Sequence, residues 1–188
     1  MINAQIRECL SRLEQFMGTV TDALALPRDA AEFTHAVVLA RGARRALEIG
    51  TSYGYSGVWI ASALADGGTL VTIDHDVRKS DIARGAFASA GLADRIDIRT
   101  GPAMEMLHQV TGPFDFVLID ADKDHCIQYV GLIADKLSPR SVVLTDNTAT
   151  HSAQLAEFMA YMRRRPDFHT VNVPIGNGMD MSVRLPGS

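Results

Sequence analysis

The apolar positions in the first part of the chain recur at helical spacing, with charged residues between them. They are Ile2, Ile6, Leu10, Leu13, Met17 and Val20. This period predicts an amphipathic helix, which Pro27 breaks. A second apolar stripe predicts another helix, capped by Asp29 and ended near Gly42. We therefore expect residues 1–43 to form a helical extension ahead of the rest of the chain.

From residue 44 onward, short β-type runs alternate with helical stretches. The predicted strands are Ala46–Gly50, Thr69–Asp74, Arg95–Arg99, Phe114–Asp120 and Ser141–Asp146. The predicted helices are Tyr55–Leu64, Val77–Ala90, Ala103–Val110 and His125–Leu137, with a last one through Leu155, Phe158, Met159 and Met162. Strands that alternate with helices of this length predict a parallel sheet with right-handed crossovers.

The last two β-type runs, Phe168–Pro174 and Met179–Leu185, flank Ile175-Gly-Asn-Gly178 and predict an antiparallel hairpin. Together with the five parallel strands they predict a Rossmann-like α/β sheet of seven strands, mostly parallel. Neither an internal repeat nor a linker interrupts the pattern, so residues 1–188 are expected to form a single domain.

The composition fits one soluble α/β domain of 188 residues with 47% hydrophobic and 21% charged residues. A formal net charge of −4 argues against nucleic acid or an anionic membrane as the main partner. No apolar run approaches the ~18 residues of a membrane span, and the first residues lack a signal-peptide pattern. We expect a cytoplasmic protein, in which Cys9 and Cys126 are buried thiols.

The stretch Leu47-Glu-Ile-Gly-Thr-Ser-Tyr-Gly-Tyr-Ser56 reads as a strand, a glycine-spaced turn and a helix start. This arrangement brings backbone N–H groups against a nucleotide-like ligand. The spacing Glu-x-Gly-x-x-x-Gly lacks the G-x-G-x-x-G pyrophosphate loop, which argues against NAD or FAD. A wider turn that begins with an acid suits a cofactor with no phosphate and a charged amino-acid tail, for which S-adenosylmethionine (SAM) is the candidate.

Carboxylates stand at the ends of most predicted strands, where ligands of open α/β sheets bind. Asp74 lies about 20 residues beyond the glycine turn, a position suited to hydrogen bonds with a ribose diol. The alternative is that Asp74 caps the next helix, a role that Asp76 fills equally well.

A second set of polar residues follows the fourth and fifth strands, which we expect to be neighbours in the sheet. Asp120, Asp146 and the amide of Asn147 would then converge beside the cofactor. Two carboxylates and an amide oxygen suit Mg²⁺, Mn²⁺ or Ca²⁺. The alternative is a pair of helix caps, Asp122 and Asn147, with Lys123 merely solvated.

These motifs resemble the cation-dependent class I O-methyltransferases, the family of caffeoyl-CoA and catechol O-methyltransferases and their bacterial relatives. The stretches that carry the resemblance are Leu47–Ser56, Gly101-Pro-Ala103, Ile119-Asp-Ala-Asp-Lys123 and Thr145-Asp-Asn147. The resemblance implies the seven-stranded class I methyltransferase fold. It implies a SAM site formed by Glu48, Gly50, Thr51, Ser56, Asp74, Ala103 and Asp120. It also implies Asp120, Asp146 and Asn147 as metal ligands, and Lys123 as the catalytic base beside Asp120.

The activity expected from this resemblance is metal-dependent transfer of a methyl group from SAM to a hydroxyl of a small catechol-like or hydroxylated aromatic substrate. One alternative is the same chemistry on a hydroxylated wobble uridine of tRNA, against which the net charge counts. Another is a SAM-binding protein without turnover, against which Lys123 argues. A homodimer through the N-terminal helices is also expected. The segment before Glu48 is shorter than is usual in the caffeoyl-CoA branch, and Asn177 replaces a frequent acid, so the substrate and the dimer contacts stay open.

Overall fold

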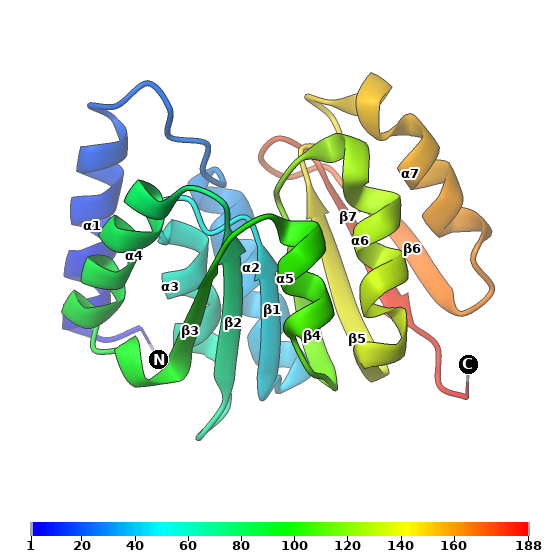
Figure 1. The fold of residues 1–188 in the computed structure, drawn as a ribbon, viewed down its shortest axis with the longest axis horizontal. Coiled ribbons are helices and arrows are strands. Elements are labelled where there is room, and N and C mark those ends of the chain that lie inside the picture. The colour runs from blue at the N-terminus through cyan, green and yellow to red at the C-terminus, as the bar shows by residue number, and fades with distance from the viewer. Residues whose placement is uncertain (1, 188) are drawn as a thin grey trace.

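A seven-stranded sheet forms the centre of the structure, a computed structural model that describes residues 2–187. The strands are β1 (Arg45–Ile49), β2 (Thr69–Asp74), β3 (Ile96–Thr100), β4 (Phe114–Ile119), β5 (Leu137–Asp146), β6 (Phe168–Val173) and β7 (Met179–Arg184). Their order is β3-β2-β1-β4-β5-β7-β6. The first five strands are parallel, and β7 lies antiparallel between β5 and β6 (Figure 1). The Rossmann-like sheet with a C-terminal hairpin is therefore confirmed.

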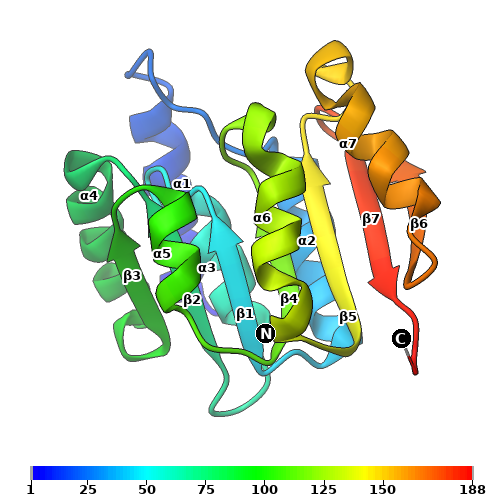
Figure 2. The same cartoon turned by 45° about the vertical axis from the view of Figure 1, so that its right-hand side comes forward.

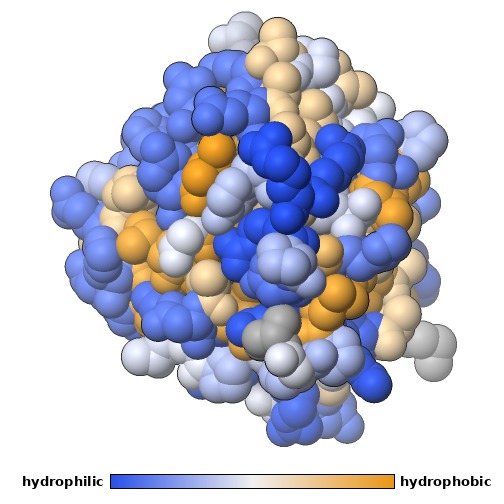
Figure 3. All heavy atoms as spheres, turned by 90° about the vertical axis from the view of Figure 1, so that its right-hand side faces the viewer, coloured by the Kyte–Doolittle hydropathy of each residue, from blue (hydrophilic) through white to orange (hydrophobic). Residues whose placement is uncertain are grey.

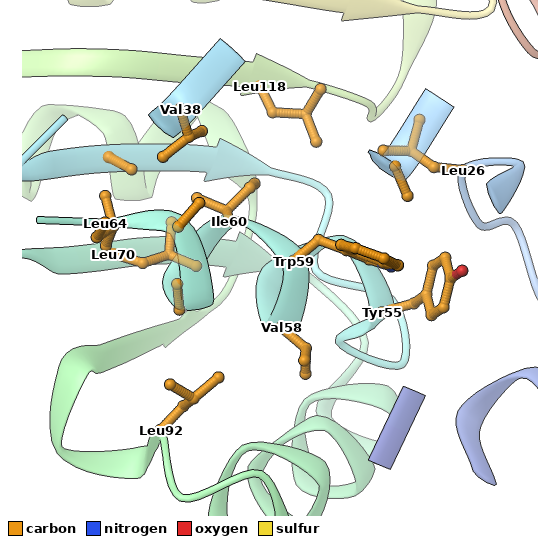
Figure 4. Packing of buried hydrophobic residues seen from close by; sticks show 14 of the residues in the cluster. Leu26, Val38, Tyr55, Val58, Trp59, Ile60, Leu64, Leu70, Leu92 and Leu118 are labelled. Atoms are coloured by element: carbon orange, nitrogen blue, oxygen red, sulfur yellow. The ribbon is translucent and has the colours of Figure 1, made fainter. Parts of the chain in front are cut away.

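Seven α-helices pack on the two faces of this sheet (Figures 1 and 2). They are α1 (Ala4–Met17), α2 (Arg28–Arg41), α3 (Tyr55–Ala63), α4 (Val77–Ser89), α5 (Ala103–Gln109), α6 (Cys126–Ile133) and α7 (Ser152–Arg164). Helices α1 to α4 share one apolar cluster with one face of the sheet, and α5 to α7 share another with the opposite face. Figure 4 shows part of the first cluster, with side chains from α2, α3 and β4.

Strand β4 shows why the central strands read as continuous apolar runs. Phe116 and Leu118 belong to the first cluster, whereas Val117 and Ile119 belong to the second. Successive side chains of a strand point to opposite faces, so a strand covered on both sides needs apolar residues at every position. The first polar residue after this apolar run, Asp120, follows the end of β4 and lies outside both clusters.

Two predicted boundaries differ from the structure in the region that leads into β5. The expected helix His125–Leu137 is shortened to α6, flanked by 3₁₀ turns at Lys123–His125 and Ala134–Lys136. Strand β5 starts at Leu137 instead of Ser141, with a register shift against β4 between Phe114 and Phe116. The exposed residues Pro139 and Arg140 lie at this irregular start, so the apolar run marks only the buried part of the strand.

The N-terminal helices are present, but Asp29 does not cap α2. Pro27 occupies the N-cap position, and Asp29 lies inside the first turn. Its carboxylate accepts hydrogen bonds from the backbone N–H of Ala30, at 2.9 Å, and of Gly176, at 3.1 Å. The side chain therefore joins α2 to the hairpin loop. Gly42 ends α2 in the left-handed conformation (φ +61°), as expected.

The surface of the molecule has both hydrophilic and hydrophobic residues. Strand β6 forms one edge of the sheet and exposes His169, Val171 and Asn172. Seen from this side, hydrophilic residues are interspersed with small hydrophobic patches (Figure 3).

Both cysteines are buried free thiols, as expected. Within residues 2–187, no helix has the length and apolar character required to cross a bilayer.

Candidate active site

A cavity of about 1030 Å³ opens at the carboxyl ends of the parallel strands. It lies where the strand order reverses between β1 and β4, the usual ligand position in open α/β sheets. Most of the predicted site residues line it, namely Gly50, Asp74, Ala103, Asp120, Lys123, Asp146 and Asn147. Residues far apart in the sequence therefore meet in one site.

Gly50 fixes how closely β1 and β4 approach at the floor of the cavity. Its φ is +110°, and a Cβ at this position would lie 2.0 Å from the carbonyl oxygen of Asp120. The N–H of Asp120 in turn donates to the carbonyl of Ile49 at 2.9 Å. Only glycine fits this close approach, so the turn residue also sets the position of Asp120.

Asp74 holds the glycine turn and faces the cavity. One carboxylate oxygen accepts a hydrogen bond from the N–H of Ser52 at 2.7 Å, and the other accepts one from the N–H of Asp76 at 2.9 Å. The cap of α4 is Asp76, whose side chain accepts from the N–H of Lys79. Asp74 is therefore not the helix cap. Each of its oxygens keeps acceptor capacity for a ligand hydroxyl.

Glu48, Thr51 and Ser56 lie behind the turn, outside the lining of the cavity. Glu48 is fully buried, and its Oε2 accepts a hydrogen bond of 2.6 Å from Thr72 Oγ1, which in turn lies 2.6 Å from Thr51 Oγ1. Burial raises the pKa of Glu48 to about 7, and the carboxylates of Asp120 and Asp74 add to the effect. These residues support the turn from inside, and their contact with a cofactor stays a prediction.

Asp120, Asp146 and Lys123 also line the cavity. Lys123 Nζ donates to Asp120 Oδ1 at 3.0 Å, and the two side chains are only 10% and 15% exposed. Asp146 is 1% exposed, and its Oδ1 has no hydrogen-bond partner among the described residues. Burial, together with the charge of Asp120, raises the pKa of Asp146 to about 7. A buried, unpaired carboxylate beside a second one is unfavourable unless a cation or a donor joins them.

These residues fit a hard divalent cation. Asp146 ends β5, Asp120 follows the neighbouring β4, and Asn147 comes next with φ +67°. Within residues 2–187, no cluster of three or more His, Cys, Asp or Glu side chains is arranged as metal ligands. The predicted ligands Asp120, Asp146 and Asn147 do not form such a cluster, because the third ligand is an amide oxygen.

The alternative of two helix caps holds only for Asp122. Asp122 caps the 3₁₀ turn at Lys123–His125 by accepting from the N–H of Asp124, and it also contacts His125 at 2.7 Å. The N-cap of α7 is His151, so the Asn147 side chain has no capping role there. Lys123 is largely buried beside Asp120 and is not a solvated surface lysine.

Several residues that line the cavity are missing from the sequence-based set of site residues. Among them are Ala23, Leu24, Ala25, Tyr129, Gln154 and Asn177. The carbonyl of Asn177 accepts from the N–H groups of Ala149 and Thr150, which places the hairpin loop beside the end of β5. The unusual Gly-Asn-Gly sequence is the one local signal for this position. Residues 23–25 carry no periodic pattern, so only the folded chain brings them to the cavity.

The fold is that of Rossmann-like methyltransferases. Residues 2–185 match the family model described as O-methyltransferase, and the chain therefore belongs to that family. This confirms the resemblance seen in the motifs.

Individual relatives agree with this family. The chain is 36% identical over 143 residues to a catechol O-methyltransferase of Mycobacterium tuberculosis, covering 73% of this chain and 65% of the relative. It is 32% identical over 181 residues to caffeoyl-CoA O-methyltransferase 2 of Eucalyptus globulus, covering 84% and 73%. An O-methyltransferase from Bacillus cereus, solved in complex with SAH (S-adenosylhomocysteine), superposes with a TM-score of 0.87 at 29% identity, covering 94% of this chain and 90% of that one. The chain thus spans less than two thirds of the catechol relative's length.

Proposed function

We propose that this chain transfers a methyl group from SAM to a hydroxyl of a small catechol-like or hydroxylated aromatic substrate, with a divalent cation, Mg²⁺ first and Mn²⁺ or Ca²⁺ as alternatives. The observation that carries the proposal is the buried Asp146 carboxylate with its unpaired oxygen, beside Asp120 and Lys123 in the cavity that also holds the glycine turn. Membership of the O-methyltransferase family and the SAH complex of the Bacillus cereus relative support it.

The glycine turn, Asp74 and Ala103 would hold the methyl donor. Asp74 is fixed by the N–H groups of Ser52 and Asp76, so its free acceptor positions are oriented for the two ribose hydroxyls. The turn offers no crowded nest for a diphosphate, which fits a sulfonium cofactor better than a dinucleotide. Asp120, at the junction of both halves, lies where it can accept from the methionine amino group.

Asp120, Asp146 and Asn147 would hold the cation. When bound, such an ion lowers the pKa of a coordinated hydroxyl and orients two neighbouring substrate oxygens. The residues around it then determine where the proton goes. Lys123 Nζ lies 3.0 Å from Asp120 and faces the same cavity, so it can receive the proton of the acceptor hydroxyl.

The methyl transfer itself is a displacement that depends on positioning. The deprotonated acceptor oxygen forms a bond with the methyl carbon, the carbon–sulfur bond breaks, and its electron pair stays on sulfur. The products are a methyl ether and SAH, and the proton resides on Lys123. Because donor and acceptor would be held in one cavity, the fold contributes to the reaction by aligning them.

Incubation with SAM and a panel of catechols, with Mg²⁺ or with a chelator, tests the proposal. We expect a one-methyl mass gain on at least one vicinal diol, lost on chelation and restored by added Mg²⁺. Turnover that persists in the chelator would contradict the metal step. Failure of the protein to bind SAH in a calorimetric titration would contradict the whole proposal.

A further inference from the structure

The loop that leads from β5 into α7 and contains Asn147 packs against the hairpin loop between β6 and β7 (Figure 1). The N–H of Thr148 donates to the carbonyl of Gly178 at 3.0 Å, and the next two N–H groups donate to the carbonyl of Asn177 at 3.0 and 3.2 Å. Asn147 has a φ of +67°, a conformation that few residues other than glycine adopt. The hairpin loop therefore holds the backbone on both sides of an expected metal ligand in place.

Gly178 allows the two loops to approach this closely. Its φ is +83°, and a Cβ at this position would lie 2.6 Å from the backbone nitrogen of Ala149 and 3.0 Å from Thr148 Oγ1. A side chain does not fit at such distances, so a larger residue would push the two loops apart. The position of Asn147 thus depends on the hairpin.

Polar side chains beside this contact join it to both strands of the hairpin. Asn172 Nδ2, on β6, donates to Asp180 Oδ1 at 2.9 Å, and to Thr148 Oγ1 and the carbonyl of Met179 at 3.3 Å. Asp180 Oδ2, on β7, accepts a hydrogen bond of 2.9 Å from Nη2 of Arg163, near the end of α7. We call Asn172, Asp180 and Arg163 the hairpin cluster.

Asp180 determines which way the amide group of Asn172 points. Its side chain is only 2% exposed, and a carboxylate this deeply buried costs free energy unless it is paired and hydrogen-bonded. Because a carboxylate only accepts hydrogen bonds, the nitrogen of the amide group must face Asp180. The same nitrogen then also faces the hydroxyl of Thr148, which is itself buried.

We propose that Asn172 is a positioning residue for the cation site and that Asp180 orients its amide group. Asn172 holds Thr148, and Thr148 fixes the backbone of the preceding residue, Asn147, whose amide oxygen is an expected ligand. This inference rests on the proposed function, because it takes Asn147 to be a metal ligand.

The expected donor site lies away from the hairpin cluster in the sheet. The glycine turn follows β1 and Asp74 ends β2, whereas the cluster belongs to β6, β7 and α7. Strands β4 and β5 lie between these two groups of strands. Loss of the cluster should therefore weaken cation binding and leave SAH binding unchanged, whereas a general loss of structure would weaken both.

Calorimetric titrations of the full chain with Mn²⁺ and, separately, with SAH test the proposal. Asn172→Ala removes the amide group at an exposed position, where the substitution does not threaten folding. We expect it to weaken Mn²⁺ binding about two- to tenfold, the range for loss of one hydrogen bond. The Kd of SAH should stay that of the unaltered chain.

The role of Asp180 is tested by Asp180→Asn, which keeps the size of the side chain and removes its charge. Asp180→Asn should weaken Mn²⁺ binding more in the unaltered chain than in the Asn172→Ala variant, because Asp180 acts through Asn172. Equal losses in the two backgrounds would show that Asp180 acts on the ion independently of Asn172.

Thr170→Val is the matched control, because Thr170 Oγ1 lies 2.9 Å from Ser182 Oγ across the same two strands. This pair lies two residues further along each strand from the hairpin loop than Asn172 and Asp180 do. Thr170→Val should change neither dissociation constant. If Asn172→Ala binds Mn²⁺ as tightly as the unaltered chain, or loses SAH affinity to the same extent, the positioning role is refuted.

The proposed function fails in a different way from this inference. If the unaltered chain itself binds no Mn²⁺, the cation step of the proposed function is wrong. If the unaltered chain binds Mn²⁺ and the Asn172→Ala variant binds it equally well, only the role of the hairpin cluster is wrong.

Discussion

In the proposed mechanism, removal of the proton from the acceptor depends on Lys123. Replacing it with Ala is expected to lower kcat by about 100-fold or more, the usual contribution of a general base. SAH affinity should stay close to that of the unaltered chain, because the proposed function assigns Lys123, which lines the cavity, to the acceptor. Steady-state kinetics and calorimetry on the same preparation separate the two effects. Equal losses of kcat and SAH affinity would show that Lys123 is structural.

Asp146 gives the proposed cation site its clearest support. Its buried Oδ1 lacks a partner among the described residues, so a bound ion would stabilise the folded state selectively. At an ion concentration of about 100 times Kd, the free energy of unfolding should rise by about 2.7 kcal/mol. Asp146→Asn should abolish most of this rise in Mg²⁺ or Mn²⁺ melting curves. An equal rise in the variant would place the ion elsewhere.

The sequence predicted which polar residues meet in the cavity better than how deeply the residues of the motifs are buried. Asp120, Lys123, Asp146 and Asn147 were identifiable because polar residues that end buried parallel strands must meet at one edge of the sheet. Glu48 belongs to the same motif, yet it is fully buried behind the turn, and no local pattern encodes that depth. Asn177 was missed as a cavity residue because its place depends on the distant contact of the hairpin loop with residues 149 and 150.

At the scale of the elements, the Asp115 carboxylate links the first residues of three parallel strands. These residues lie at the amino ends of the strands, on the side of the sheet opposite the cavity. Its carboxylate accepts from the N–H groups of Arg44 and Arg45, from the Ser138 hydroxyl, and from Arg41 at 3.1 Å. Burial alone would raise the pKa of Asp115, but these donors lower it below the ordinary value. A carboxyl group with a lowered pKa stabilises the fold above its ordinary pKa and loses that contribution as the pH falls through the folded-state pKa.

Asp115→Ala is therefore expected to lower the free energy of unfolding by about 1–3 kcal/mol at pH 7, because four hydrogen-bond donors lose their acceptor. The difference from the unaltered chain should shrink as the pH falls below about 4. Urea denaturation at pH 7 and pH 3 measures both. Asp97→Ala, on the edge strand β3 where the side chain is half exposed, should change stability by no more than about 0.5 kcal/mol. A loss in the Asp115 variant that is the same at both pH values would contradict the role of its charge.

Gly50, in the turn after β1, and Gly85, in α4, provide a matched pair of glycines. Gly50→Ala should destabilise the chain by about 2–4 kcal/mol, through its positive φ and the clash with Asp120. Gly85 lies in α4 with no atom within 4 Å of an added Cβ, so Gly85→Ala should raise stability by about 0.5–1 kcal/mol. Thermal melts of the two variants distinguish the positions. Similar changes in both would show that β1 and β4 tolerate separation.

The sequence predicted which segments form helices and which form strands. It predicted the first and last residues of these elements less well. The central strands were identified because burial on both faces requires unbroken apolar runs. The start of β5 was missed because Pro139 and Arg140 are exposed and resemble a loop. Asp29 was expected as a cap because acids favour helix starts, but Pro27 takes that position and Asp29 binds the hairpin loop instead.

At the scale of the whole molecule, the burial of the apolar residues of α1 bears on the expected homodimer through the N-terminal helices. Ile6, Cys9, Leu10 and Leu13 of α1 are buried within the chain. Its apolar face is therefore already used, and a dimer through this helix would have to use polar residues. The homodimer, like the cytoplasmic location, stays a prediction.

The central claim is that one cavity binds the methyl donor and a cation-held acceptor side by side. Diffraction at the manganese absorption edge, from crystals grown with SAH and Mn²⁺, tests it most directly. The predicted result is SAH along the glycine turn and Asp74, with a manganese anomalous peak bonded to Asp120, Asp146 and Asn147. A peak at other residues, or SAH bound with these three side chains free of metal, would contradict the claim.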